Sequence, residues 1–191
     1  MQNNKIMDPN KRHAIILRIV QNGVVAALYY AITLVLMAIP VLSQFGPIQC
    51  RVSEILVLLA FFRPDLTFGL SLGCFFVNLT GLLMGLPGTT PVDMGIGTAA
   101  TLLSCLCMAY LCRHLIFALI YPVLFNGVLV GIELYYILGI TDQGPLIAVM
   151  GLVALGELIA VGIGYCIFMG LMRNRRFMNL LRPTRHQNAK W

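Results

Sequence analysis

Two acidic residues lie inside apolar stretches of this sequence, where carboxylates are rare. Glu133 and Glu157 are flanked on both sides by aliphatic residues. A carboxylate without a partner is costly in hydrocarbon, so each acid needs a partner or a ligand. Asn126 precedes Glu133 by seven residues, which places both on one face of a helix. The three residues predict a polar slot that opens toward the outside; the alternative is hydrogen bonding between helices with a structural role.

Further polar residues fall at the predicted outer rim of the same slot. Arg51 and Glu54 begin a short apolar stretch, and because they are three apart on a helix they can instead form a local ion pair. Asn78 lies near the outer end of one apolar run, and Asp93 begins the next. The predicted substrate-binding set is Gln49, Arg51, Glu54, Asn78, Asp93, Asn126, Glu133 and Glu157.

The sequence lacks the usual motifs of catalysis. It has no phosphate-binding loop, no zinc-protease motif and no serine-hydrolase elbow. We therefore expect no catalytic residue, no metal ligand and no cofactor in this chain, and we do not expect an enzyme. Its basic C-terminal stretch has one aromatic residue, Trp191, so nucleic acid is not an expected partner.

The composition indicates how these polar groups are positioned. The chain has 191 residues, of which 59% are hydrophobic and 10% charged, and its mean hydropathy is +0.88. A water-soluble domain of this size cannot bury so much apolar surface, so the sequence predicts an all-α polytopic membrane protein. A crossing needs about 20 apolar residues. Five runs are long enough: 23–43, 66–86, 94–112, 115–139 and 145–172.

Residues 52–62 are the uncertain segment, because their length suits a half-crossing as well as a tilted helix. Positive charge gathers on the cytoplasmic side of membrane proteins. If residues 52–62 cross, 12 of the 13 Lys and Arg residues lie inside and Arg51 lies outside; otherwise the division is 9 against 4. The sequence therefore predicts six transmembrane helices with both termini in the cytoplasm.

The chain is predicted to form a single membrane domain over residues 1–191. Residues 10–20 alternate basic and aliphatic side chains, which is typical of an amphipathic helix at the membrane surface. Residues 22–172 are the predicted six-helix bundle. Residues 173–191 are a basic cytoplasmic tail, which faces anionic lipid headgroups, a partner or solvent.

Small residues repeat every fourth position in the first apolar run. Gly23, Ala27 and Ala31 would lie on one face of a helix, where they permit close approach of another backbone. They can pack inside the bundle or against another protein, and the sequence does not separate these two interpretations.

Three segments together resemble a known family. GPIQCRVSEILVLLAFF (46–62), NGVLVGIEL (126–134) and VALGELI (153–159) resemble the QueT family of substrate-binding S-components of energy-coupling factor (ECF) ABC transporters. The resemblance implies a multi-pass protein of the bacterial cytoplasmic membrane that captures a queuosine precursor, such as preQ1 or queuine, outside the cell. A coupling subunit and two ATPases, which bind ATP and Mg, would drive its release inward.

The resemblance also implies roles for individual residues. Ala27 and Ala31 match a signature for docking on the coupling subunit, with Gly23 on the same stripe. The P-I-Q-x-R-x-S-E match places Gln49, Arg51 and Glu54 beside the ligand entrance, and the other two segments supply Asn126, Glu133 and Glu157.

Two alternatives remain open from the sequence. Cys50 stands where the family pattern has an aromatic residue, and related S-components carry other cargo, including cobalamin. The chain can also be a self-sufficient secondary transporter in which Glu133 and Glu157 relay protons.

Overall fold

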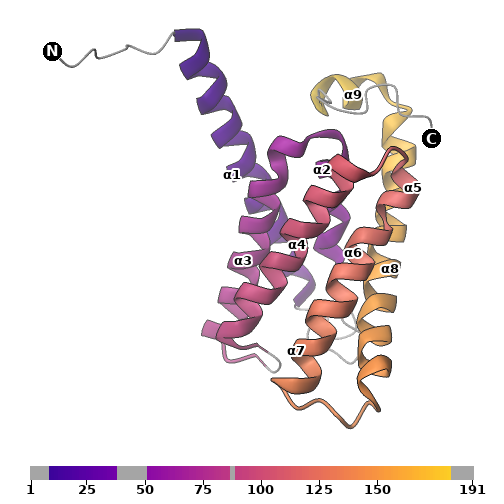
Figure 1. The fold of residues 1–191 in the computed structure, drawn as a ribbon. Helices are drawn as coiled ribbons and strands as arrows, with labels where there is room; N and C mark the ends of the chain where they lie inside the picture. The colour runs from indigo at the N-terminus through magenta and orange to yellow at the C-terminus, as the bar shows by residue number, and fades with distance from the viewer. Residues whose placement is uncertain (1–8, 38–50, 87–88, 182–191) are drawn as a thin grey trace, which may run out of the picture.

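The protein is a bundle of long, mostly antiparallel helices (Figure 1). The computed structural model describes residues 9–37, 51–86 and 89–181, and every regular element in these ranges is helical. Five helical stretches among them are long and apolar enough to cross a membrane: Asn10–Leu36, Pro64–Leu83, Pro91–Leu111, Leu115–Tyr136 and Leu146–Met172. The all-α membrane class is thereby confirmed, and the protein is a multi-pass membrane protein.

The first helix is longer than the sequence indicates. Helix α1 (Pro9–Met37) is continuous, so residues 10–20, expected as a separate surface helix, form its first turns. Their side chains are exposed, and Figure 1 shows this end of α1 extending beyond the bundle. At the other end of the chain, α9 (Arg175–Leu181) lies within the predicted basic tail and buries Leu181. The location of both segments relative to the membrane stays a prediction.

The short apolar segment lies at the centre of the bundle. It consists of a 3₁₀ helix, η2 (Val52–Leu58), followed by α2 (Leu59–Phe62), and it packs against α1, α4 (Pro91–Leu111) and α8 (Leu146–Met172). At about 2.0 Å per 3₁₀ residue and about 1.5 Å per α residue it is roughly 20 Å long, short of the roughly 30 Å of hydrocarbon. Residues 38–50 lie outside the described part, so the six-span count stays a prediction.

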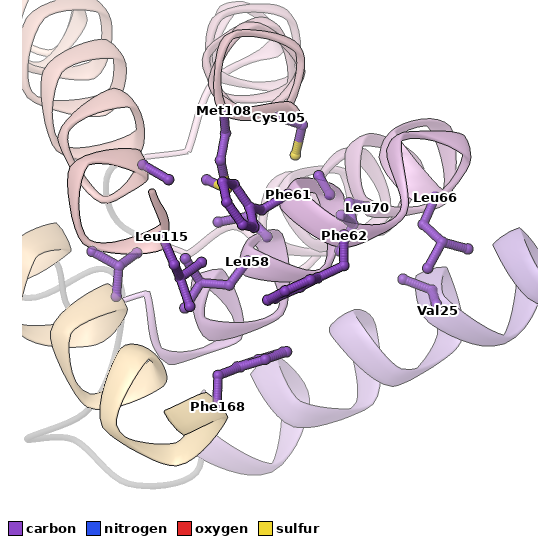
Figure 2. Packing of buried hydrophobic residues seen from close by; sticks show 14 of the residues in the cluster. Val25, Leu58, Phe61, Phe62, Leu66, Leu70, Cys105, Met108, Leu115 and Phe168 are labelled. Atoms are coloured by element: carbon purple, nitrogen blue, oxygen red, sulfur yellow. The ribbon is translucent and has the colours of Figure 1, made fainter. Parts of the chain in front are cut away.

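Aromatic and aliphatic side chains fill the core around this central segment. Leu58, Phe61 and Phe62 are fully buried, and the ring of Phe62 stacks on Phe168 of α8 with 6.3 Å between centroids (Figure 2). A helix buried on all sides must be apolar all round, which explains why residues 55–62 contain no charged residue. This core supports η2, which carries Glu54, and Arg51 directly precedes it.

The span that carries Asn126 and Glu133 is not a regular α-helix. It runs through α5 (Leu115–Ala118), α6 (Ile120–Phe125), a π-helical turn η4 (Asn126–Val130) and α7 (Gly131–Tyr136). Gly127 and Gly131 face α8 so closely that a Cβ at Gly127 would lie 2.9 Å from the Cβ of Ala154. The glycines of the NGVLVGIEL segment therefore allow this span to pack closely against α8.

A polar cluster around Arg63 joins α1 and α9 to the segment that follows α2. Arg63 forms a bidentate pair with Asp65 at 2.8 and 2.6 Å and also donates to Gln21 of α1 and to the carbonyl of Leu181. The side chain of Asn22 donates to the carbonyl of Asp65 and accepts from the amide of Gly69. These bonds connect α1, η3 (Pro64–Leu66), α3 (Thr67–Leu83) and α9.

The contact between α1 and α3 predicts an asymmetry between two glycines. Gly69→Ala places a Cβ 2.5 Å from the backbone oxygen of Asn22, so the helices must separate; we expect a loss of about 1–3 kcal/mol in stability. Thermal unfolding in detergent measures this as a lower Tm.

The matched control is Gly162→Ala in α8, where a Cβ meets nothing within 4 Å. Alanine is the better helix former, so the control should keep or raise the Tm. Equal Tm values for the two variants would contradict the close packing of α1 on α3.

Candidate functional site

A second group of buried polar side chains lies inside the bundle. They are contributed by η2, α3, α4, η4, α7 and α8, and every predicted substrate-binding residue within the described ranges is at most 6% exposed. These residues are Arg51, Glu54, Asn78, Asp93, Asn126, Glu133 and Glu157. Gln49 lies outside the described residues, so its predicted role stays a prediction.

Arg51 forms an ion pair between elements. One terminal nitrogen of Arg51 lies 3.7 Å from the carboxylate of Asp93 on α4, so its ion-pair partner is Asp93 rather than the nearby Glu54. The side-chain amide of Asn78 on α3 donates to the carbonyl of Asp93 at 3.2 Å. A Cβ at Gly97 would lie 2.6 Å from the Asn78 amide nitrogen and 3.3 Å from Arg51, so this position needs glycine.

Glu54 accepts hydrogen bonds from two hydroxyl groups on a single carboxylate oxygen. The Tyr29 hydroxyl of α1 donates to Glu54 Oε1 at 2.5 Å, and the Thr101 hydroxyl of α4 donates to the same atom at 3.1 Å. The other oxygen, Oε2, is buried and has no hydrogen-bond partner among the described residues.

Glu133 and Glu157 each have a buried carboxylate oxygen without a hydrogen-bond partner in the described ranges. The hydroxyl of Thr90 donates to Glu133 Oε1 at a long 3.4 Å, while Glu133 Oε2 and Glu157 Oε1 have no hydrogen-bond partner within the described ranges. Glu133 interacts electrostatically with Asp93 and Arg51, and Glu157 with Glu54 and Arg51. Asp93 is the acid that pairs directly with Arg51, whereas Glu133 and Glu157 have no ion pair in the described ranges.

Asn126 occupies the start of the π-helical turn. It is 1% exposed, and both polar atoms of its side chain lack a partner among the residues that the structure describes. Its turn, η4, packs against α4 and α8, which carry Asp93 and Glu157. π-Helical turns inside α-helices are frequent at functional sites, because they redirect side chains locally.

The unsatisfied atoms define what the cluster can bind. Each buried polar atom without a partner costs about 1–3 kcal/mol, and native proteins have few of them. Here acceptors predominate: Glu54 Oε2, Asn78 Oδ1, Asn126 Oδ1, Glu133 Oε2 and Glu157 Oε1, against the donors Arg51 Nη1 and Asn126 Nδ2. No group of His, Cys, Asp and Glu side chains in the described residues has the arrangement of a metal site. The arrangement suits a ligand rich in N–H donors.

Sequence reasoning missed three residues of the site. Thr90 precedes α4 and its hydroxyl accepts from the amide of Asp93, while Thr101 follows Asp93 by two four-residue steps with Gly97 between them. That spacing of four was a usable signal for one helix face. Tyr29 gave no such signal, because nothing in the sequence shows which face of α1 meets Glu54.

An apolar groove of about 510 Å³ lies elsewhere on the bundle, between α6, η4 and α8. Its lining has no polar side chain, so it does not offer the contacts of the buried cluster. Residues of this lining include Ile120, Leu124, Gly127, Ile147, Met150 and Ala154.

The small residues of α1 face away from the bundle. Gly23, Ala27 and Ala31 are exposed, whereas Val25 and Tyr29 on the other face are buried. A Cβ at Gly23 would meet nothing within 4 Å. Within the described residues, these three positions therefore do not pack inside the bundle, and their contact with another protein stays a prediction.

Comparison with known proteins identifies the family. A family model described as QueT transporter matches residues 19–173, which include all seven described site residues. No curated protein and no solved structure matches the chain. Since the match covers most of the 191 residues, including the buried polar cluster and the outward face of α1, the chain belongs to the QueT transporter family.

Proposed function

We propose that this protein is the substrate-binding subunit of an ECF-type ABC importer and captures a cationic 7-deazaguanine, such as preQ1 or queuine, from outside the cell. The observation that carries the proposal is the set of four buried carboxylates, Glu54, Asp93, Glu133 and Glu157, together with the buried Arg51, which pairs with Asp93. Membership of a transporter family supports it.

The ligand chemistry complements this cluster. A 7-deazaguanine presents adjacent N–H donors, which a carboxylate can accept in a two-point contact, and preQ1 adds a cationic amine. Its carbonyl oxygen can accept from Arg51 Nη1 or Asn126 Nδ2, two of the donors without partners among the described residues. A cation would also offset the excess of negative charge, which is costly to bury. A neutral cargo such as cobalamin has no positive charge with which to compensate these acids.

Energy for transport would come from other subunits. The sequence has no nucleotide-binding motif, so we assign ATP and Mg to two partner ATPases and no cofactor or catalytic residue to this chain. The outward stripe of Gly23, Ala27 and Ala31 would contact the transmembrane coupling subunit.

The proposed setting is the bacterial cytoplasmic membrane, with both termini in the cytoplasm. Arg173, Arg175 and Arg176 are exposed around the start of α9, where they would meet anionic lipid headgroups. Nucleic acid is not a proposed partner.

Removing one buried charge at a time tests the binding site. We expect Glu133→Gln and Glu157→Gln each to weaken preQ1 binding at least tenfold, because a hydrogen bond to a charged group contributes about 1.5–3 kcal/mol. Isothermal titration calorimetry on the purified protein in detergent measures the Kd.

Asp142→Asn is the matched control, since Asp142 is exposed in the turn between α7 and α8. It should bind as the wild type does. Wild-type affinity in both glutamate variants would remove these acids from the site.

A bulky residue on the outer face of α1 tests the docking surface. Ala27→Trp should leave the Kd for preQ1 unchanged, because the side chain points away from the bundle, and should prevent co-purification with the coupling subunit. Ala99→Trp, at an exposed position of α4, is the control and should assemble normally. Normal assembly of the Ala27 variant would exclude this face as the docking site.

The need for partner subunits can be measured directly. Liposomes that contain only this chain should not accumulate preQ1 under a proton gradient, because the chain has no energy source of its own in the proposed mechanism. Accumulation driven by the gradient would instead support the secondary transporter, with Glu133 and Glu157 as proton carriers.

A further inference from the structure

Helix α1 has one face that packs into the bundle and another that is exposed. Ala27 and Ala31 lie on its exposed face, while Tyr29, between them in sequence, is 1% exposed and points into the bundle. Tyr29 is the residue of α1 that hydrogen-bonds to a predicted ligand-binding acid, Glu54, in the described structure. The same short stretch of helix therefore contacts the polar cluster on one side and is open to a partner on the other.

The position of Tyr29 is closely defined by its neighbours. Gly73 of α3 lies so near that a Cβ there would be 2.8 Å from the Cβ of Tyr29, and the Thr33 hydroxyl donates to the Tyr29 carbonyl at 3.0 Å. The Tyr29 ring is held against α3. A movement of α1 relative to η2 would therefore lengthen the hydrogen bond from the Tyr29 hydroxyl to Glu54.

The Tyr29 hydroxyl makes the shorter of the two hydrogen bonds that Glu54 accepts from described residues. Its carboxylate lies on the 3₁₀ helix η2 and is 0% exposed, with Tyr29 at 2.5 Å and Thr101 at 3.1 Å on Oε1. Both donors share one oxygen, so the second, Oε2, is left without a hydrogen bond from the described residues. The shorter of the two bonds thus fixes which oxygen remains available to a ligand.

We propose that Tyr29 is a positioning residue that makes α1 part of the ligand site: its hydroxyl orients Glu54 for the ligand and couples ligand occupancy to the position of α1. This inference rests on the proposed function. It goes further by connecting the site with the helix whose outer face carries Ala27 and Ala31. A ligand that binds Glu54 stabilises one position of α1, and by linkage a displacement of α1 weakens ligand binding by the same factor.

The test uses two neighbouring tyrosines of the complete, purified chain. Tyr29→Phe removes the hydroxyl that reaches Glu54, whereas Tyr30→Phe removes one that pairs with Thr80 of α3 at 2.9 Å. Both variants lose one hydroxyl from α1 and keep the ring. We expect Tyr29→Phe to raise the Kd for preQ1 about tenfold, and Tyr30→Phe to change it less than twofold, by calorimetry.

Two further readouts separate positioning from a general loss of stability. In wild type, preQ1 should slow amide hydrogen exchange in residues 25–33 of α1; this protection should persist in Tyr30→Phe and disappear in Tyr29→Phe. In a Glu54→Gln background, Tyr29→Phe should change the Kd less than twofold, because the two residues act together.

The outcomes distinguish the inference from the function on which it rests. If wild type does not bind preQ1, the proposed function fails and this inference fails with it. If wild type binds but the two tyrosine variants have equal Kd values, or α1 gains no protection with ligand, the inference alone is overturned. A lower Tm in Tyr29→Phe with an unchanged Kd shows a purely structural bond and also overturns it.

Discussion

Burial of several carboxylates around one guanidinium is the constraint on which this structure depends. Arg51 pairs with Asp93 and interacts electrostatically with Glu54, Glu133 and Glu157. In hydrocarbon such a group of acids is stable only when protons, hydroxyl donors or a bound cation compensate the charge. Tyr29, Thr90 and Thr101 provide part of this compensation, and the atoms that remain without partners in the described site define the rest.

Close packing of helices brings these groups together. Gly97 lets Asn78 and Arg51 approach α4, and Gly127 and Gly131 let the span with Asn126 and Glu133 approach α8. Small residues have this role in membranes, where apolar side chains gain little by leaving lipid for protein. The site therefore depends on the positions of these glycines as much as on the positions of the polar residues.

The sequence predicted the class of the fold and singled out acids that the structure buries, because both depend on composition and on isolated charges in apolar runs. That these acids bind a ligand stays a prediction. Length and hydropathy sufficed for the five long spans. They did not suffice for η2, whose 3₁₀ geometry and central position arise from packing against α1, α4 and α8. Tyr29 was missed for a related reason: the pairing of α1 with η2 is a tertiary contact, and tyrosine is common in membrane helices.

The π-helical turn shows why even a correct residue list leaves geometry open. In a regular α-helix, Asn126 and Glu133 would share one face, as their spacing of seven predicts. One extra residue in the turn rotates the following side chains by about 100°. Both residues are nevertheless buried, because η4 packs against α4 and α8, and α7 packs against α8. The spacing of seven residues therefore does not by itself define how the two buried side chains are arranged relative to each other.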